Sequence, residues 1–243
     1  MTRCAMLLAA GFGKRMRPLT EKTAKPLLPL GGRTLLDHAL DRLVAAGVTR
    51  VVVNTHWQGD LVARHLKRRT VGLEIVLRTE DSLLDTGGAV AAAVAAGALG
   101  DAPFFVINGD SFWLDGPTPA LDRVAAAFDP ASVDTILLVH RTFQIHSEVG
   151  RGDFSVDPWG GVRRRREREV VPYLYAGVQL TTPALFKDVP TGPFSMNLLW
   201  DRAIATGRLR GVVHDALWFH LSRPGDLSDA EAALHARETG ETR

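Results

Sequence analysis

Short apolar runs alternate with longer amphipathic or alanine-rich stretches from the first residues to about residue 140. The apolar runs predict strands over residues 3–9, 50–54, 74–78, 104–108 and 135–140. The stretches between them predict helices over residues 34–46, 59–68, 88–98 and 119–128. Continuous apolar strands separated by helices are typical of a parallel sheet that is covered on both faces. The pattern therefore predicts an α/β fold.

The pattern changes after residue 150. Gly, Asp and Pro turns there separate the short runs DFSVD, VRRRR and YLYAGVQL, which predict strands. Two further helices are expected, over residues 197–205 and 227–239. We interpret this second half as a lid or smaller lobe of one domain, because 243 residues suit a single domain with a sizeable core.

Composition excludes several classes of protein. With 46% hydrophobic and 23% charged residues the chain matches ordinary globular usage. A net charge of +2 and few aromatic residues argue against a nucleic-acid partner, and a single cysteine argues against a disulfide framework. No apolar stretch is long enough for a membrane span or resembles a signal peptide. We therefore expect a protein of the reducing cytoplasm, without a membrane partner.

The segment LLAAGFGKRMRPLT, residues 7–20, carries the first chemical signal. A glycine turn that leaves a buried strand lets backbone N–H groups approach a phosphate chain closely. The cations Lys14, Arg15 and Arg17 follow this turn and can neutralise such a chain. The segment therefore predicts a site for a nucleoside triphosphate.

Two better-known phosphate loops do not fit this segment. The dinucleotide fingerprint G-x-G-x-x-G fails because Met16 stands where its third glycine belongs. The P-loop fails because Arg15, instead of Ser or Thr, follows the Gly-Lys pair. Neither dinucleotide binding nor hydrolysis of the P-loop type is supported.

A carboxylate follows another expected strand, in the segment VINGDSF. Asp110 lies just beyond the carboxyl end of that strand, where open α/β sheets bind ligands. Carboxylate oxygens are the ligands that Mg²⁺ prefers. Asp110 is therefore our candidate for holding a divalent metal.

Two blocks of this sequence together resemble the sugar-1-phosphate nucleotidyltransferase family. Residues 8–20 match its L-A-[AG]-G-x-G-x-R-[ML]-x-P-L-T block, and residues 25–29 match the K-P-[LM]-[LV]-P block that follows. The resemblance covers essentially the whole chain. It implies a Rossmann-like, doubly wound mixed sheet with a small sugar-binding lobe. It also implies transfer of a nucleotidyl group from a nucleoside triphosphate to a sugar 1-phosphate, with release of pyrophosphate.

The resemblance assigns roles to particular residues. It implies catalytic roles for Arg15 on the β- and γ-phosphates, for Lys25 at the transferred phosphoryl centre, and for Asp110 on the metal. The small residues of DTGGAV, from Asp85 onward, match a family segment beside the nucleobase and ribose. The nucleotide-binding residues that it implies are Leu8, Ala9, Ala10, Gly11, Gly13, Asn54, Thr86, Gly87, Gly88 and Asn108.

The sugar side rests on weaker matches. The expected sugar-phosphate residues are Gly150, Arg151, Asp153, Glu167 and Gly177. Residues 1–145 would then bind nucleotide, residues 146–225 would bind sugar phosphate, and residues 226–243 would form a C-terminal helix. The segments VVNTHW and GRGDF favour the bacterial branch that uses UTP and N-acetylmuramate 1-phosphate, which implies peptidoglycan recycling.

His220 departs from the family pattern. Relatives have W-x-D-V-G-T with the Asp as second metal ligand, whereas this chain reads WFHLSRP. Imidazole is a poor ligand for Mg²⁺ and suits Mn²⁺ or Zn²⁺ better. Three interpretations stay open: Asp110, water and phosphates hold Mg²⁺ alone, His220 contacts a softer metal or a phosphate, or the site is degraded.

Other functions stay open as well. Within the family they are guanylyl transfer to mannose or heptose 1-phosphate and thymidylyl transfer to glucose 1-phosphate. Outside it, Ser222 and Arg223, which replace the Gly-Thr pair after His220, leave room for a non-catalytic regulator that binds nucleotide sugars. We expect a monomer or a small homo-oligomer.

Overall fold

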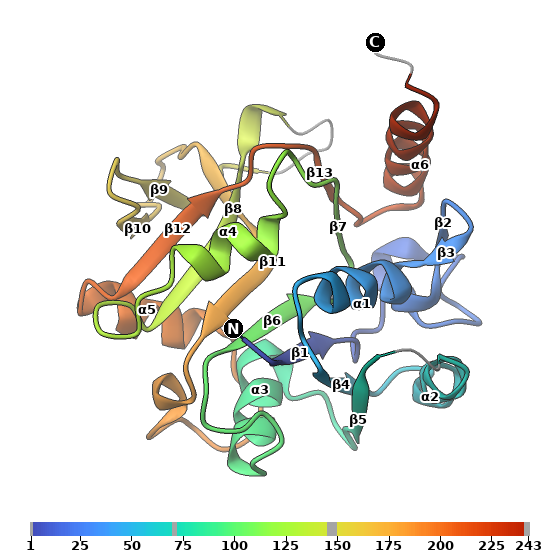
Figure 1. Cartoon of the computed structure of the whole chain (residues 1–243), viewed down its shortest axis with the longest axis horizontal. Coiled ribbons are helices and arrows are strands. Elements are labelled where there is room, and N and C mark those ends of the chain that lie inside the picture. The colour runs from blue at the N-terminus through green and yellow to red at the C-terminus, as the bar shows by residue number, and fades with distance from the viewer. Residues whose placement is uncertain (1, 70–71, 145–149, 241–243) are drawn as a thin grey trace.

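A computed structural model describes residues 2–69, 72–144 and 150–240 of the chain. Its largest sheet has nine strands (Figure 1). The strands of the chain are β1 (Cys4–Leu8), β2 (Pro29–Leu30), β3 (Arg33–Thr34), β4 (Arg50–Thr55), β5 (Glu74–Thr79), β6 (Phe104–Asn108), β7 (Ser111–Trp113), β8 (Thr135–Arg141), β9 (Phe154–Val156), β10 (Val162–Arg164), β11 (Tyr173–Thr181), β12 (Leu209–Val213) and β13 (Trp218–His220). The α-helices are α1 (Leu35–Ala45), α2 (Gly59–Lys67), α3 (Asp85–Ala95), α4 (Ala120–Ala126), α5 (Asn197–Ala205) and α6 (Pro224–Thr239).

The order of the strands creates a switch point in the sheet. The main path runs β10-β9-β11-β6-β1-β4-β5, and β1 pairs in parallel with both β4 and β6. The chain thus moves from β1 to one side through β4 and β5, and then crosses back to β6. Such a switch point opens a crevice at the carboxyl ends of the strands. The register sets Leu8 opposite both Asn54 and Asn108, so three loops leave the sheet at one level.

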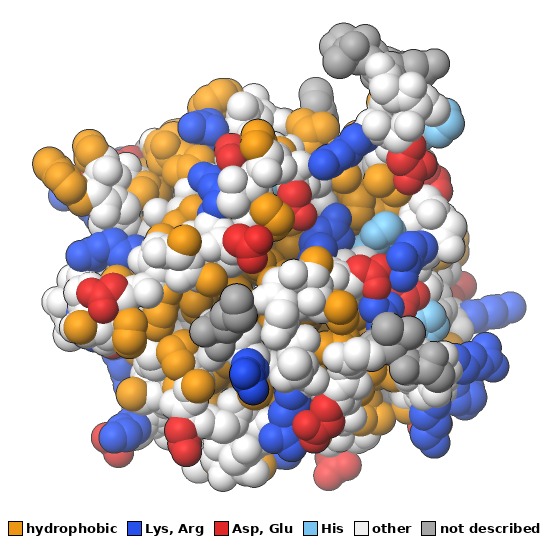
Figure 2. Space-filling model, in the orientation of Figure 1, with side chains coloured by type: hydrophobic (Ala, Val, Ile, Leu, Met, Phe, Trp, Pro, Cys, Tyr) orange, Lys and Arg blue, Asp and Glu red, His pale blue; other side chains and the backbone are white. Residues whose placement is uncertain are grey.

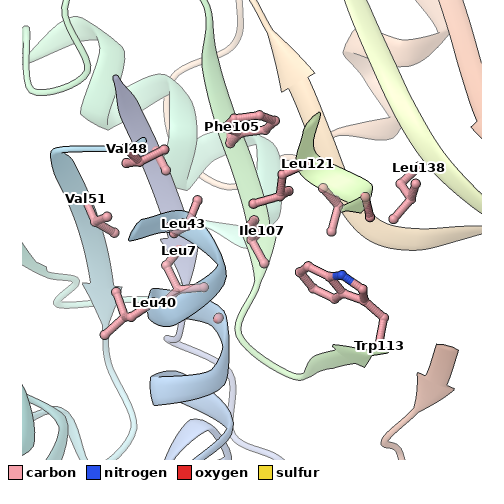
Figure 3. Packing of buried hydrophobic residues seen from close by; sticks show 14 of the residues in the cluster. Leu7, Leu40, Leu43, Val48, Val51, Phe105, Ile107, Trp113, Leu121 and Leu138 are labelled. Atoms are coloured by element: carbon pink, nitrogen blue, oxygen red, sulfur yellow. The ribbon is translucent and has the colours of Figure 1, made fainter. Parts of the chain in front are cut away.

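Each face of the sheet has its own hydrophobic core. On β1, Ala5 and Leu7 belong to one core and Met6 to the other, as the alternation of side chains along a strand requires. Helices α1 and α4 cover the first core, where Leu40 and Leu43 pack near β1 and β6 (Figure 3). Helices α3 and α5 cover the second core. Full burial of each leucine stabilises the fold by about 1.5–3 kcal/mol.

The second half of the chain is less separate than expected. Strand β11 lies between β6 and β8 and is antiparallel to both, and β12 extends the same sheet beyond β8. Strand β8 therefore does not pair with β6, although its sequence fits the series of parallel strands. The expected mixed sheet is confirmed, but the residues expected to form a small lobe share the central strands of the sheet with the first half of the chain.

A smaller unit covers one end of the sheet. Strand β13 pairs with β7, which follows β6 directly, and the β2–β3 hairpin packs beside them against α6. Helix α6 stands away from the main sheet in Figure 1, and its Leu227 and Ala230 are buried against a third cluster around Phe112. Sequence patterns did not reveal β2, β3, β7, β12 or β13, because each is short or borders a turn.

The surface shows no extended basic stripe in the view of Figure 2. Lys and Arg side chains gather over α2 at the right edge, and charges of both signs are mixed over the rest of this face. No helix within the described residues is long and apolar enough to cross a bilayer.

Two buried histidines fix the turn that precedes β13. The Nε2 of His214 donates to the carbonyl oxygen of Leu114 at 3.1 Å, and the Nε2 of His140 lies 3.1 Å from the carbonyl oxygen of Ala216. The ring of His140 also stacks on Trp218. Burial lowers the pKa of both histidines below the ordinary 6.5, so both rings are neutral in the folded protein at neutral pH.

We expect acid to destabilise the fold through these two rings. Their contribution is fully present above pH 6.5 and is lost as the pH falls below that value, by up to about 1.4 kcal/mol per pH unit for each group. Urea unfolding at pH 7.5 and 5.5 measures the loss. His214→Gln should have a lower free energy of unfolding than the native protein at pH 7.5, but that free energy should fall less than in the native protein between pH 7.5 and 5.5. An identical pH dependence in His214→Gln, or a changed one in the exposed control His235→Gln, would contradict this account.

Candidate functional site

A cavity of about 510 Å³ lies at the carboxyl ends of β1, β4 and β6. Its position is the switch point of the sheet, as the strand order predicts. It is lined by Leu8, Ala9, Ala10, Gly11, Gly13, Lys14, Arg15, Met16, Lys25, Pro26, Asn54, Glu80, Leu83, Asp85, Thr86, Asn108, Gly109, Asp110 and Ser222. The cavity thus brings together all three expected catalytic residues and most of the expected nucleotide-binding residues.

The glycine loop after β1 offers a row of free backbone donors. Within the described part of the chain, the N–H groups of residues 10–15 have no hydrogen-bond acceptor. Gly13 adopts the left-handed conformation, with φ +60°, and its carbonyl oxygen accepts from Met16 N–H and from the Thr20 hydroxyl. Consecutive N–H groups around a left-handed residue form a concavity that binds anions. The side chains of Lys14 and Arg15 add positive charge to it.

Lys25 and Asp110 form an ion pair inside the cavity. The Lys25 Nζ lies 2.7 Å from Asp110 Oδ2, and the two side chains are 11% and 44% exposed. A nearly buried ammonium is stable only with such a partner. Pro26 follows Lys25 in a 3₁₀ turn and restricts its backbone. The pair places a cation and a carboxylate beside the glycine loop.

Close backbone contact holds Asp110 at this position. The Gly109 N–H donates to the carbonyl oxygen of Leu8 at 2.8 Å. A Cβ on Gly109 would lie 2.6 Å from that oxygen, so a larger residue does not fit. The loop after β6 therefore crosses directly over the end of β1.

A buried amide–carboxylate pair forms the other end of the cavity. Asn54 Nδ2 donates to Glu80 Oε1 at 2.6 Å, and Asn54 Oδ1 accepts from Ala9 N–H. Glu80 Oε2 accepts from Leu84 N–H at 3.1 Å. This network ties the loops after β1, β4 and β5 together. Sequence reasoning missed Glu80, although it follows an expected strand in the same way that Asp110 does.

The start of α3 contacts both the cavity and the segment before α5. Thr86 lines the cavity, and its hydroxyl accepts from Met196 N–H. Gly87 and Gly88 do not line it, and both of their N–H groups donate to Phe194 O. Their expected contact with the nucleotide stays a prediction. A Cβ on Gly87 would lie 2.5 Å from the Phe194 ring. These glycines thus serve close packing between α3 and the segment before α5.

The residues expected on the sugar side lie outside this cavity. Arg151 is exposed, and its carbonyl oxygen accepts from Val171 N–H. Asp153 Oδ2 accepts from Tyr175 N–H and so helps to hold β9 beside β11. Gly150 and Glu167 are exposed, and nothing in the described residues links either of them to the cavity.

Gly177 allows close packing of β11 against residues next to Asp110. It has φ +77°, and a Cβ there would lie 1.8 Å from Ser111 Oγ and 3.3 Å from Asn108 Cβ. It therefore lets β11 pass closely beneath the chain that carries Asp110. Its expected role beside the sugar stays a prediction.

His220 and Tyr175 lie within the electrostatic field of the ion pair. Burial, together with the charges of Arg15 and Lys25, lowers the pKa of His220 against the opposing effect of Asp110. The imidazole is thus neutral at neutral pH. Burial raises the pKa of the Tyr175 phenol, and Asp110 acts in the same direction. Tyr175 therefore keeps its proton and can donate a hydrogen bond.

Sequence comparison supports the expected family. Residues 4–142 match the family described as Nucleotidyl transferase. The chain is 43% identical over 236 residues to the N-acetylmuramate alpha-1-phosphate uridylyltransferase of Caulobacter vibrioides, covering 96% of this chain and 97% of that protein. It is 31% identical over 235 residues to the protein of the same name from Neisseria meningitidis, covering 96% and 98%. A mannose-1-phosphate guanyltransferase of Emericella nidulans is 28% identical over 229 residues, which are 92% of this chain and 62% of that one.

Solved structures share the fold. UDP-glucose pyrophosphorylase complexed with UDP-glucose superposes with a TM-score of 0.81 at 15% identity, covering 98% of this chain and 100% of that one. HddC from Yersinia pseudotuberculosis complexed with GMP-PN superposes with a TM-score of 0.76 at 20% identity, covering 96% and 99%. The expected fold class is confirmed.

We expect Gly177→Ala to lower the free energy of unfolding by about 2–4 kcal/mol, through overpacking against Ser111 and a left-handed backbone. Urea unfolding measures this change. Ser111→Gly removes the two nearest atoms, so the double variant should recover the overpacking part of the loss. Equal losses in Gly177→Ala and the double variant would show that the contact with Ser111 is unimportant.

Proposed function

This chain belongs to the nucleotidyl transferase family, and we propose that it transfers the uridylyl group of UTP to N-acetylmuramate 1-phosphate and releases pyrophosphate. The choice of substrates rests on the names of the relatives with 43% and 31% identity. The observation that carries the reaction type is the meeting of a free N–H concavity, Arg15 and the Lys25–Asp110 pair in one cavity.

The residues of the cavity suit an in-line displacement at the α-phosphorus. An oxygen of the sugar phosphate attacks this phosphorus, and the bond to the pyrophosphate oxygen breaks. Repulsion between two anions is the main barrier, so catalysis consists of positioning and charge neutralisation. The loop N–H groups and Arg15 hold the departing phosphates, and Lys25 stabilises the negative charge at the phosphorus.

Asp110 fits a divalent metal that is shared with the substrate. The described residues contain no cluster of three His, Cys, Asp or Glu side chains able to enclose an ion. Mg²⁺ commonly binds through one or two carboxylates while water and substrate phosphates complete its shell. Asp110 would hold such an ion, which neutralises phosphate charge when bound. Neutral His220 offers a nitrogen ligand that suits Mn²⁺ better.

The base end of the cavity is built on Asn54 and Glu80. We propose that the nucleobase lies against their network and that the ribose lies near Thr86. Because Glu80 accepts two hydrogen bonds from the protein, its position is fixed before ligand arrives. We further place the reaction in the cytoplasm, in the recycling of peptidoglycan sugars, since its proposed substrates are UTP and a cell-wall sugar phosphate.

We expect the purified protein with Mg²⁺ to release pyrophosphate when UTP and N-acetylmuramate 1-phosphate are present together. An enzyme-coupled pyrophosphate assay would test UTP, GTP, dTTP, CTP and ATP against this ester and a panel of hexose 1-phosphates. Lys25→Ala serves as the control, and it should lower kcat far more than nucleotide affinity. Release with GTP and mannose 1-phosphate instead would assign guanylyl transfer. UTP binding without release for any pair would assign a regulator.

The metal assignment has a separate test. We expect Asp110→Asn to raise the Mg²⁺ concentration for half-maximal activity at least about tenfold, because a charged ligand is lost. His220→Asp supplies a second carboxylate and should lower that concentration about three- to tenfold. Binding of Mn²⁺ in the presence of UTP, followed by electron paramagnetic resonance, gives a readout apart from turnover. If His220→Asp and its control His220→Asn behave alike, His220 lies outside the metal shell.

A further inference from the structure

We propose that Trp57 and Thr20 are positioning residues that hold the glycine loop in its phosphate-binding shape. The inference deepens the proposed function, since it concerns how the same cavity receives a triphosphate. Neither residue lines the cavity, and Trp57 lies 37 positions from Thr20 in the chain. Their connection is visible only in the folded protein.

Two hydrogen bonds in series link the loop to the chain after β4. The indole Nε1–H of Trp57 donates to the carbonyl oxygen of Thr20 at 3.2 Å. The hydroxyl of Thr20 donates to the carbonyl oxygen of Gly13 at 2.8 Å. Thr20 is 1% exposed, and its Cγ2 lies 3.0 Å from the place that a Cβ on Gly13 would take. We call this series the Trp57–Thr20 relay.

Ring contacts hold Phe12, at the tip of the loop, against His56 and Trp57, two residues that we call the platform. The Phe12 ring meets the His56 ring edge-on at 5.5 Å and the Trp57 ring at 5.8 Å. The Lys14 ammonium lies 5.2 Å from the centre of the Phe12 ring. Each aromatic contact is worth a modest free energy beyond its buried area. Together these contacts hold Phe12, which lies between two glycines, against His56 and Trp57.

The platform is itself anchored to the sheet. His56 and Trp57 directly follow β4, and His56 Nδ1 donates to the carbonyl oxygen of Glu80 at 2.8 Å, just beyond β5. The proton is assigned to Nδ1 because a carbonyl oxygen only accepts. The relay therefore connects the loop to the end of β4, which is buried from Val51 to Thr55, and to the end of β5, which pairs with β4.

The need for such a support follows from the loop itself. Gly11, Lys14 and Arg15 are exposed, and the loop rejoins the core only at Met16. An exposed glycine-rich segment has high conformational entropy, and its ordering opposes the binding of any ligand that requires one shape. By holding the Gly13 carbonyl, the relay keeps the loop, whose N–H groups at residues 10–15 have no acceptor among the described residues, in one shape before a ligand binds.

Thr20→Val and Thr20→Ser form a matched pair for the test. The first retains the branched shape and removes the hydroxyl, whereas the second retains the hydroxyl. We expect Thr20→Val and Trp57→Phe each to weaken UTP binding and to raise KM for UTP about three- to tenfold, the worth of one neutral hydrogen bond. KM for the sugar phosphate and the affinity for UMP should change less than twofold.

Thr20→Ser should restore UTP binding to within about twofold of the native protein. Because both hydrogen bonds belong to one series, the double variant Thr20→Val with Trp57→Phe should weaken UTP binding by less than the product of the two single fold-changes. Trp159→Phe, at an 84% exposed residue in the turn between β9 and β10, controls for loss of a tryptophan. Urea midpoints monitor stability, and Trp57→Phe serves alone if Thr20→Val does not fold.

Isothermal titration with UTP, UMP and inorganic tripolyphosphate separates this inference from the proposed function. If the native protein binds UTP and tripolyphosphate but never releases pyrophosphate, the proposed reaction is refuted. The relay is then still tested by comparing triphosphate binding in the native protein and the variants. The relay is refuted if Thr20→Val binds both triphosphates as the native protein does. It is also refuted if UTP, UMP and sugar phosphate all weaken equally, since that indicates a general structural defect.

Discussion

The parallel pairing of β1 with β4 on one side and β6 on the other is the constraint on which the site depends. The ladder sets Leu8 opposite both Asn54 and Asn108, so the loops that follow them start at one level. The glycine loop continues β1, Asp110 lies two residues after β6, and Asn54 lies near the end of β4. A slip of one residue in either pairing would turn every core side chain to the wrong face. The hydrophobic cores on both faces therefore specify the geometry of the cavity.

Glycines at points of close backbone contact also determine the geometry of the cavity. Gly109 crosses the end of β1 where a Cβ would meet Leu8 O at 2.6 Å, and Gly177 passes beneath Ser111 where a Cβ would meet Oγ at 1.8 Å. Gly87 and Gly88 let the chain at Phe194 pack on the start of α3. The segment before α5 is thereby fastened to the helix whose first turn lines the cavity. The wall of the cavity at α3 and the second half of the chain thus form one continuous structure.

Local patterns predicted what depends on neighbouring residues in the chain. The positions of β1, β4, β5, β6 and β8 and of the helices between them follow from periodicity. The candidate residues Arg15, Lys25 and Asp110 follow from strand ends and the family blocks. The insertion of β11 between β6 and β8 was not predictable, because strand order depends on packing between distant segments. Gly87 and Gly88 illustrate the same limit, since a glycine pair looks alike whether it faces a ligand or Phe194. Glu80 was missed because its partner Asn54 comes from another strand.

The Lys25–Asp110 pair explains why a metal-bound triphosphate suits this cavity better than either component alone. An anion that approaches Lys25 competes with Asp110 for the ammonium, and a cation that approaches Asp110 competes with Lys25 for the carboxylate. A cation alone leaves the Lys25 ammonium, which is 11% exposed, without a partner in a poorly solvated place, and this is costly. An anion alone deprives the Asp110 carboxylate, which is 44% exposed, of its partner and adds negative charge beside it. A phosphate that arrives with a divalent cation supplies a partner to both residues at once. The pairing therefore opposes binding of the free ions and favours the complex that the proposed reaction consumes.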